Sequence, residues 1–426
     1  MQDQLPNNYK NLVIGYVAPG WPLSHFPNGI VAYIHNLLSG LDAKTQPIIF
    51  AVSTLNDDLK DSIIDLSKLD VKKPFLQRLL DSILFRLNES FKRNFQYQRG
   101  IAENASKILL GIQQLHMPLD VLEMEESFGT ASYLFKRTNI PIVTRLHGPW
   151  FLIGPILRAE NDWDFKLRVA YEREAIENAH GVTSPSLDVL EKVRQYYDIT
   201  LPHAQVIPNP VLEVAIEKQW QYDINTLPFI LFVGRFDSVK GGDLILESFR
   251  LIAQKNTEIK LFFVGPDRGL LLEGKAVKFE EYVNQYIPEK DIKNRIQFLG
   301  HCDHERISDL RKNALVTVVC SRYENFPLSL LEALAAGCPT VATVAGGMKE
   351  IVIDDYNGLL AESESPKSIA EKVFMLISDP EKMQRLSKNA IEDCKKRFSP
   401  EVVAAQTVEY YQSVLARASN SVTKIS

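Results

Sequence analysis

The sequence predicts an α/β protein of two doubly wound domains that face each other across a central cleft, and three observations support this fold class. The 426 residues exceed what one hydrophobic core usually organises. Short apolar runs alternate with helical patterns in both halves of the chain, which is typical of parallel sheets. A proline-rich segment between the two halves indicates a linker. We therefore expect two sheets, each covered by helices.

The first domain is expected to span residues 1–205. Its first strand is the apolar run 11–18, which is followed by a loop rich in Pro and Gly and then by a helical pattern over 30–41. Further strands are predicted at 47–52, 120–124, 140–146 and 181–186.

The linker is expected at 206–227, where prolines interrupt any long helix. The second domain, 228–400, restarts the alternation, with strands predicted at 228–236, 260–265, 295–300, 315–321, 339–343 and 357–361. The remaining residues, 401–426, are expected to form a C-terminal helix that packs back on the first domain.

Composition places the chain among ordinary globular proteins, with 45% hydrophobic and 24% charged residues. The net charge of −5 gives no general attraction to nucleic acid, so we expect no nucleic-acid partner. The polar N-terminus and the lack of an apolar run of about 18 residues favour a cytoplasmic protein. The four cysteines show no C-x-x-C spacing, so reduced structural thiols are favoured over a zinc site or disulfides.

The stretch SRYENFPLSLLEALAAGCPT, residues 321–340, predicts a short apolar helix over 328–336. Pro327 suits the first turn of this helix, and Gly337 suits the position just past its end. Glu324 then lies at the N-terminus, where free backbone amides and the helix dipole favour an anion, and Glu332 lies within the helix. Taken alone, the two glutamates have two equally good interpretations. They bind the hydroxyls of a ligand, or Glu324 is a loop charge and Glu332 is a solvated helix residue.

The loop FVGRFDSVKGGD, residues 232–243, follows the first strand of the second domain and contains Arg235 and Lys240 beside two glycines. Two cations with neighbouring backbone donors suit a diphosphate, although a basic surface turn has the same composition. Neither half of the chain contains G-x-G-x-x-G, which argues against a dehydrogenase.

Together, the blocks GRFDSVKGGD, SRYENFPLSLLEALAAGCPTVAT and AGGMKEIV resemble the retaining nucleotide-sugar glycosyltransferases of family 4, which have the GT-B fold of two Rossmann-like domains. The resemblance implies an enzyme that moves a sugar from a nucleotide-diphosphate sugar to a glycan, a lipid-linked acceptor or a small molecule, in polysaccharide or glycoconjugate biosynthesis. It also implies that the anomeric configuration is retained. A UDP-sugar is expected as the donor in preference to a GDP-sugar, and no cofactor is expected.

The resemblance implies a role for each motif residue. Arg235 and Lys240 would hold the donor diphosphate, Glu332 the ribose hydroxyls, and Glu324 the hydroxyls of the transferred sugar. The resulting catalytic set is Glu324, His147, Arg235 and Lys240, and the donor-binding set is Gly29, Arg235, Lys240, Asn325, Phe326, Pro327, Leu328 and Glu332.

Two of these positions come from the first domain. TRLHGPW places His147 at the carboxyl end of a strand, where the family has a histidine lining the reaction centre, although a single histidine is often structural. Gly29 corresponds to the family's glycine loop, but the usual Gly-Gly pair is Asn28-Gly29 here and the loop is richer in Pro and aromatic residues. Glu125 and Glu126 differ from the family pattern and receive no predicted role.

The family mechanism is pictured as front-face attack in which the leaving phosphate accepts the proton of the acceptor, so few protein bases are needed. Catalysis would then come from positioning and from charge stabilisation by protein cations. No metal is expected, and the D-x-D at 162–164 is interpreted as a coincidence because it precedes a helical stretch.

Three alternatives remain open. These are a sugar-nucleotide epimerase of the same architecture, a glycogen-phosphorylase-like enzyme and a non-catalytic nucleotide-sugar sensor. The motifs leave open the nucleotide base, the transferred sugar, the acceptor and linkage, and the oligomeric state.

Residues 72–99 are predicted to contact a membrane peripherally, at its inner face. This stretch combines apolar residues at helical spacing with a net charge of +5, as in basic amphipathic helices that lie on anionic lipid. A core-facing helix with a solvated basic side is an equally good interpretation.

Overall fold

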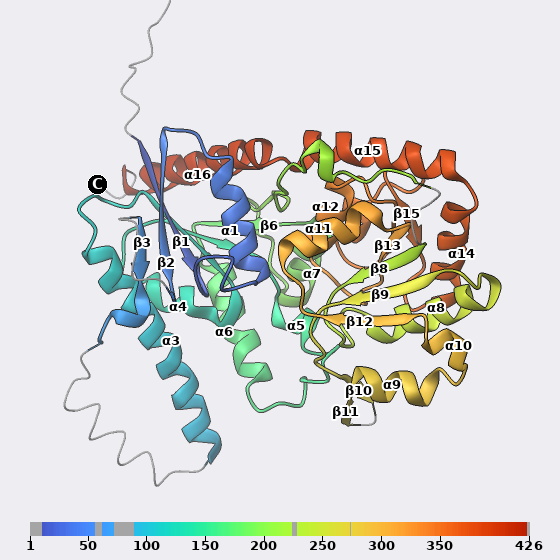
Figure 1. Cartoon of the computed structure of the whole chain (residues 1–426). Coiled ribbons are helices and arrows are strands. Elements are labelled where there is room, and N and C mark those ends of the chain that lie inside the picture. Colours follow the sequence, from blue (N-terminus) through green and yellow to red (C-terminus); the bar gives the residue numbers. More distant parts are fainter. Residues whose placement is uncertain (1–10, 56–61, 72–88, 224–227, 273, 424–426) are drawn as a thin grey trace, which may run out of the picture.

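The computed structural model describes residues 11–55, 62–71, 89–223, 228–272 and 274–423, and it contains two parallel sheets side by side, each covered by helices (Figure 1). Most of the segment 72–99, expected to contact a membrane, lies outside these residues, and the described part begins the helix α3 (Glu89–Gln113). Among the described residues, no helix is both long and apolar enough to cross a membrane.

The first sheet has seven strands in the order β3-β2-β1-β4-β5-β6-β7, all parallel. The strand order reverses between β1 and β4, and doubly wound sheets commonly bind ligands at the carboxyl ends of the strands beside such a reversal. The strands are β1 (Leu12–Ala18), β2 (Thr45–Ala51), β3 (Ile63–Asp65), β4 (Val121–Glu125), β5 (Ile142–Arg145), β6 (Gly181–Ser184) and β7 (Gln205–Val206).

Helices cover both faces of this sheet (Figure 1). The first of them, α1 (Gly29–Ser39), confirms the predicted helix, and Asn28 caps it by accepting a hydrogen bond from the amide of Ile30. The others are α3, α4 (Thr130–Leu134), α5 (Trp150–Ile153), α6 (Phe165–Glu177) and α7 (Leu187–Tyr197), with the 3₁₀ turns η1 (Leu66–Lys68) and η2 (Ser127–Gly129).

The second sheet has six parallel strands in the order β12-β9-β8-β13-β14-β15, so its order reverses between β8 and β13. The strands are β8 (Phe229–Val233), β9 (Lys260–Val264), β12 (Ile296–Gly300), β13 (Val316–Val319), β14 (Thr340–Thr343) and β15 (Leu359–Ala361). A separate antiparallel pair consists of β10 (Leu270–Leu272) and β11 (Lys275–Val277). The predicted architecture of two Rossmann-like sheets is therefore confirmed.

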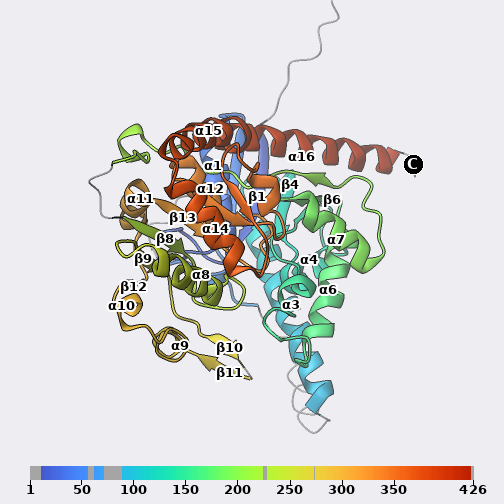
Figure 2. The same ribbon diagram turned by 90° about the vertical axis from the view of Figure 1, so that its right-hand side faces the viewer.

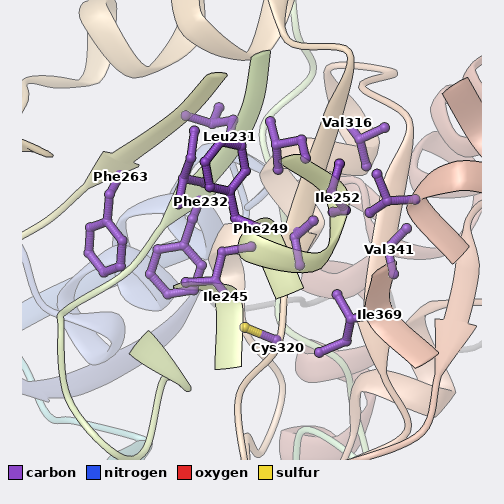
Figure 3. Packing of buried hydrophobic residues seen from close by; sticks show 14 of the residues in the cluster. Leu231, Phe232, Ile245, Phe249, Ile252, Phe263, Val316, Cys320, Val341 and Ile369 are labelled. Carbon is purple, nitrogen blue, oxygen red and sulfur yellow. The ribbon is translucent and has the colours of Figure 1, made fainter. Parts of the chain in front are cut away.

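Apolar packing holds the second sheet to its helices, as Figure 3 shows for Phe232, Phe249, Val316, Val341 and Ile369. Each of these side chains is almost fully buried, and its burial contributes about 1.5–3 kcal/mol to the free energy of folding. The helices are α8 (Gly242–Lys255), α9 (Phe279–Tyr286), α10 (Lys290–Lys293), α11 (His304–Asn313), α12 (Leu328–Ala335), α13 (Met348–Ile351) and α14 (Pro366–Ile377).

Two long helices close the chain, α15 (Pro380–Phe398) and α16 (Pro400–Thr423), and they run along one edge of the molecule in both views (Figure 1 and Figure 2). Tyr411 and Val403 of α16 are buried in a cluster with Tyr16 and Tyr33 of the first domain. The C-terminal helix therefore packs back on the first domain, as predicted. Between the two sheets the chain passes through 207–223, which includes the 3₁₀ turn η3 (Ile216–Lys218).

Candidate active site

The loop after β8 brings two cations to the carboxyl edge of the second sheet. Asp237 orders this loop, because its carboxylate accepts hydrogen bonds from Nε of Arg235 at 2.6 Å and from the backbone amide of Lys240 at 2.8 Å. Gly241, which caps α8, has a φ of 72°, and a Cβ there would lie 2.2 Å from the carbonyl oxygen of Cys320. Glycine is therefore required for the loop to pack against the end of β13.

Lys240 meets Glu324 at the point where the second sheet reverses its strand order. The Nζ of Lys240 donates a hydrogen bond to Oε1 of Glu324, and Oγ of Ser321 donates to the same oxygen at 3.1 Å. On the other side, Gly346 has a φ of 60°, and a Cβ there would lie 2.1 Å from the carbonyl oxygen of Glu324. The structure thus brings together two of the predicted site residues, which are 84 positions apart in the chain.

Free backbone donors surround the start of α12. The helix begins at Leu328 with Pro327 as its N-cap, one position earlier than the first-turn place predicted for this proline. Within the described residues, the amides of Asn325, Phe326, Leu328 and Ser329 have no acceptor. Such donors, together with the helix dipole, favour an anion at this place.

Glu332 has partners of its own, on α11 instead of the Lys240 loop. Its Oε2 accepts a hydrogen bond from Nη2 of Arg311 at 2.6 Å, and its Oε1 lies 3.8 Å from Nε2 of the exposed His304. Arg311 is almost fully buried. Nothing in the sequence motifs pointed to Arg311, because its role depends on a partner 21 positions away.

His147 follows β5 and is held between the two domains by its backbone. Its amide donates to Oε2 of Glu126 at 2.8 Å, and the next amide, of Gly148, donates to Oε1 at 2.6 Å. Its carbonyl oxygen accepts a hydrogen bond from Nδ2 of Asn325 in the second domain. The imidazole packs edge-on against the ring of Tyr33, with the ring centres 5.1 Å apart. The loop carrying His147 therefore has fixed contacts on both sides of the domain boundary.

Burial sets the protonation of these groups. Burial, together with the charge of Arg145, lowers the pKa of His147 well below its usual range, so the imidazole is neutral at neutral pH. Burial and the nearby Glu172 raise the pKa of Glu126 to about 8, and burial raises the pKa of Glu125 to about 7. Glu126, which received no role from the sequence, supports the His147 loop.

Gly29 is the first residue of α1, the helix that follows β1, and it lies one turn before Tyr33. A Cβ at Gly29 would meet nothing within 4 Å, so the space beside it is open. Gly29 therefore lies on the same helix as Tyr33, whose ring contacts His147.

A residue of the linker region connects the two domains through polar contacts. Asn209 donates from Nδ2 to the carbonyl oxygen of Phe326 at 2.9 Å, and its Oδ1 accepts from Nη2 of Arg145 at 2.9 Å. Arg145 is fully buried and lies over the ring of Tyr33, 4.0 Å from its centre. The backbone at the start of α12 is thus tied to the core of the first domain.

A second polar connection joins α13 to α7. The two carboxylate oxygens of Glu350 accept hydrogen bonds from the amides of Leu187 and Asp188, each at 2.8 Å. Asp188 also pairs with Lys349 at 3.0 Å and accepts from the hydroxyl of Tyr323 at 3.1 Å. Tyr323 directly precedes Glu324, so the boundary between the domains reaches the site itself.

The D-x-D at Asp162 and Asp164 lies in the turn before α6, and Asp164 occupies the N-cap position of that helix. It belongs to the first domain and not to the strand ends that carry Lys240 and Glu324. In the described part of the chain, no group of three or more His, Cys, Asp or Glu side chains is arranged to hold a metal ion.

Two family models match the chain in succession. Residues 27–212 match Glycosyltransferase Family 4, and residues 215–393 match Glycosyl transferases group 1. Together the two matches span most of the chain, and they support a glycosyltransferase of family 4.

An uncharacterized glycosyltransferase of Methanocaldococcus jannaschii is 30% identical to this chain over 186 residues, which cover 44% of the chain and 48% of the relative. The chain thus spans about half the length of that relative. Among solved structures, sucrose-phosphate synthase of Thermosynechococcus elongatus is similar with a TM-score of 0.69 at 19% identity, over 95% of this chain and 100% of the other. HepE of Anabaena in complex with UDP is similar with a TM-score of 0.65 at 17% identity, over 94% of this chain and 100% of HepE. These likenesses show the GT-B fold.

Proposed function

We propose that this glycosyltransferase takes its sugar from a nucleotide-diphosphate sugar, retains the anomeric configuration and needs no metal ion. The observation that supports the proposal best is the contact of Lys240 with Glu324 beside the free amides at the start of α12. This place combines a cation, helix N-terminal donors and a carboxylate at the strand-order reversal, where doubly wound sheets bind ligands. A diphosphate with hydroxyl-rich groups at both ends fits such a combination.

Each residue has a proposed task. Lys240 and Arg235 compensate the charge that develops on the departing diphosphate, and the amides from Asn325 to Leu328 bind its oxygens. Glu324 accepts hydrogen bonds from the transferred sugar, and Glu332 accepts them from the ribose. His147, which is neutral, donates or accepts a hydrogen bond near the reacting carbon while the leaving phosphate takes the proton of the acceptor.

The proposed donor is a UDP-sugar, since a structure of the similar HepE was determined with UDP-glucose. The proposed acceptor is a glycan, a lipid-linked sugar or a small molecule. An epimerase would convert a nucleotide sugar without an added acceptor, and a sensor would bind it without turnover. Product analysis of UDP-sugars incubated with and without acceptors separates the three functions.

Removing divalent ions is expected to leave transfer unchanged. The protein supplies two cations to the proposed diphosphate site, so the leaving group has charge compensation without a metal ion. The measurement is the initial rate of sugar transfer with excess EDTA and with added magnesium or manganese. Loss of transfer in EDTA, restored by either ion, would contradict metal independence and direct attention to Asp162 and Asp164.

The two glutamates are expected to differ in their effects. Glu332→Gln should weaken binding of the free nucleoside diphosphate about tenfold, because a ribose contact is present in ground and transition states alike. Glu324→Gln should mainly lower kcat, since contacts to the transferring sugar strengthen as charge develops. Calorimetric titration with UDP and steady-state kinetics measure the two effects. An equal loss of UDP affinity in both variants would show that the two roles are not separated in this way.

The membrane contact of residues 72–99 stays a prediction from the sequence. Its support is the basic, amphipathic pattern of that stretch.

A further inference from the structure

Arg311 is a buried arginine whose charge is compensated by Glu332, a carboxylate of the proposed donor site. It lies in the last turn of α11, its side chain is 4% exposed, and its Nη2 donates to Oε2 of Glu332 at 2.6 Å. Among the described residues, Glu332 is the carboxylate with which it pairs, and its Nε has no acceptor. A buried cation with so few partners depends strongly on the one carboxylate it contacts.

The same contact limits what Glu332 can do. With Oε2 bound to Arg311, the carboxylate is held in one orientation, and Oε1 is left on the more exposed side, 3.8 Å from Nε2 of His304. The guanidinium also compensates the negative charge of Glu332, which reduces its repulsion of a diphosphate in the same site. A glutamate without this partner would spread over several rotamers, since its side chain is only partly buried.

We propose that Arg311 is a positioning residue that makes this site selective for nucleotides with an intact ribose, by orienting Glu332 toward the two ribose hydroxyls. This inference rests on the proposed function, in which Glu332 accepts hydrogen bonds from the ribose. Arg311 acts through Glu332 and does not itself contact the ligand. It therefore determines the preference for a ribonucleotide over its deoxy counterpart, while the diphosphate contacts of Lys240 remain unchanged.

The test compares two ligands in matched variants. UDP, GDP and ADP are titrated into the wild-type chain by calorimetry, and the nucleotide that binds is then compared with its 2′,3′-dideoxy form. The variants are Arg311→Met, Arg311→Lys and, as a control, Arg295→Met. Arg295 is a largely buried arginine of the same domain that donates to the carbonyl oxygens of Ala253 and Asn256, at the opposite end of β12 from the site.

Arg311→Met is expected to weaken the ribonucleotide about tenfold and to change the dideoxynucleotide less than twofold, so that discrimination between them is lost. Arg311→Lys should restore part of the discrimination, because a cation returns beside Glu332. Arg295→Met should keep it in full. If Arg311→Met is too unstable to titrate, the double variant Arg311→Met with Glu332→Gln, which leaves no unpaired charge, should match Glu332→Gln alone in its affinities for both ligands.

Three results would overturn the inference. If Arg311→Met loses equal affinity for the ribonucleotide and the dideoxynucleotide, Arg311 is merely structural. If its discrimination between the two ligands is unchanged from wild type, Glu332 needs no orienting partner. A double variant that binds the ribonucleotide much more weakly than Glu332→Gln would show that Arg311 acts independently. Failure of wild type to bind any of the three nucleotides would instead refute the proposed function itself.

Discussion

Replacing Lys240 or Arg235 by alanine is expected to lower sugar transfer about a hundredfold while leaving a folded protein. A nucleoside diphosphate leaving group carries roughly two to three negative charges, and these must be stabilised as the glycosidic bond breaks. Loss of one such contact typically costs about 3 kcal/mol of transition-state stabilisation, which corresponds to the hundredfold change in rate.

The contacts of the two cations differ, and we therefore expect unequal effects. Lys240 is paired with Glu324, so Lys240→Ala also leaves that carboxylate without its cation, next to the place proposed for the phosphates. Arg235 is 46% exposed and paired with Asp237, which has a second donor in the amide of Lys240. Lys240→Ala should be the more damaging of the two. The double variant should be less impaired than the product of the single effects, because both groups act on the same charge.

Matched controls come from ion pairs elsewhere in the second domain. Arg250 is 38% exposed and pairs with Glu289, and Lys382 is 20% exposed and pairs with Asp355, compared with 22% for Lys240. Alanine at either control position should leave transfer within about twofold of wild type. Far-ultraviolet circular dichroism checks the fold of each variant. Normal transfer by Lys240→Ala, in a folded protein, would remove the assignment of this lysine to the leaving group.

The long apolar strands could be predicted from the sequence because burial on both faces leaves a continuous apolar run. β1 and β8 are examples, because each strand begins within two residues of the start of its predicted range. The short strands β3 and β7, of three and two residues, were missed because so few residues carry no periodic signal. They take part in the sheet because a neighbouring strand offers an edge, which is a tertiary effect.

The positions of the candidate site residues could be predicted where those residues lie in loops that follow strands. Arg235, Lys240 and Glu324 occur after β8 and β13, and parallel strands bring their carboxyl ends to one edge. Residues that act through distant partners could not be found in this way. Asn209 contacts the carbonyl of Phe326 across 117 positions, and no local pattern marks such a contact.

Glu126→Gln is expected to change the pH dependence of stability more than any other single substitution at the site. Burial and the charge of Glu172 raise the pKa of Glu126 in the folded protein to about 8, from a usual value of 4.5. Burial raises the pKa of Glu172 as well, but Arg168 at 2.8 Å and the amide of Trp150 at 2.7 Å favour its charged form. Among the described residues, no cation is a main cause of the shifted pKa of Glu126, which the charges of Glu172 and Glu125 raise further.

The direction of the effect follows from proton binding. Between pH 4.5 and about 8 the folded chain holds a proton on Glu126 that the unfolded chain has already lost, so stability falls as pH rises through this range. The accumulated loss is on the order of several kcal/mol, and it is complete above about pH 8. Glutamine does not titrate, so the variant lacks this loss. At every pH, however, its free energy of unfolding is lowered by about 1–3 kcal/mol, because its NH₂ group must face one of the amides of His147 and Gly148.

Urea unfolding of wild type and Glu126→Gln at pH 5.5, 7.0 and 8.5, followed by tryptophan fluorescence, measures the effect. Relative to wild type, the variant should gain stability from pH 5.5 to pH 8.5, and it should be the more stable of the two at pH 8.5. Acids that do not interact with Glu126 titrate in the same way in both proteins, so their contributions cancel in the difference. Glu103→Gln, at a half-exposed position on α3 paired with Lys107 at 3.8 Å, is the control and should differ from wild type by a small, constant amount. A difference between wild type and Glu126→Gln that stays the same at all three pH values would mean that Glu126 is ionised in the folded protein throughout. Its two backbone hydrogen bonds would then outweigh the burial that raises its pKa.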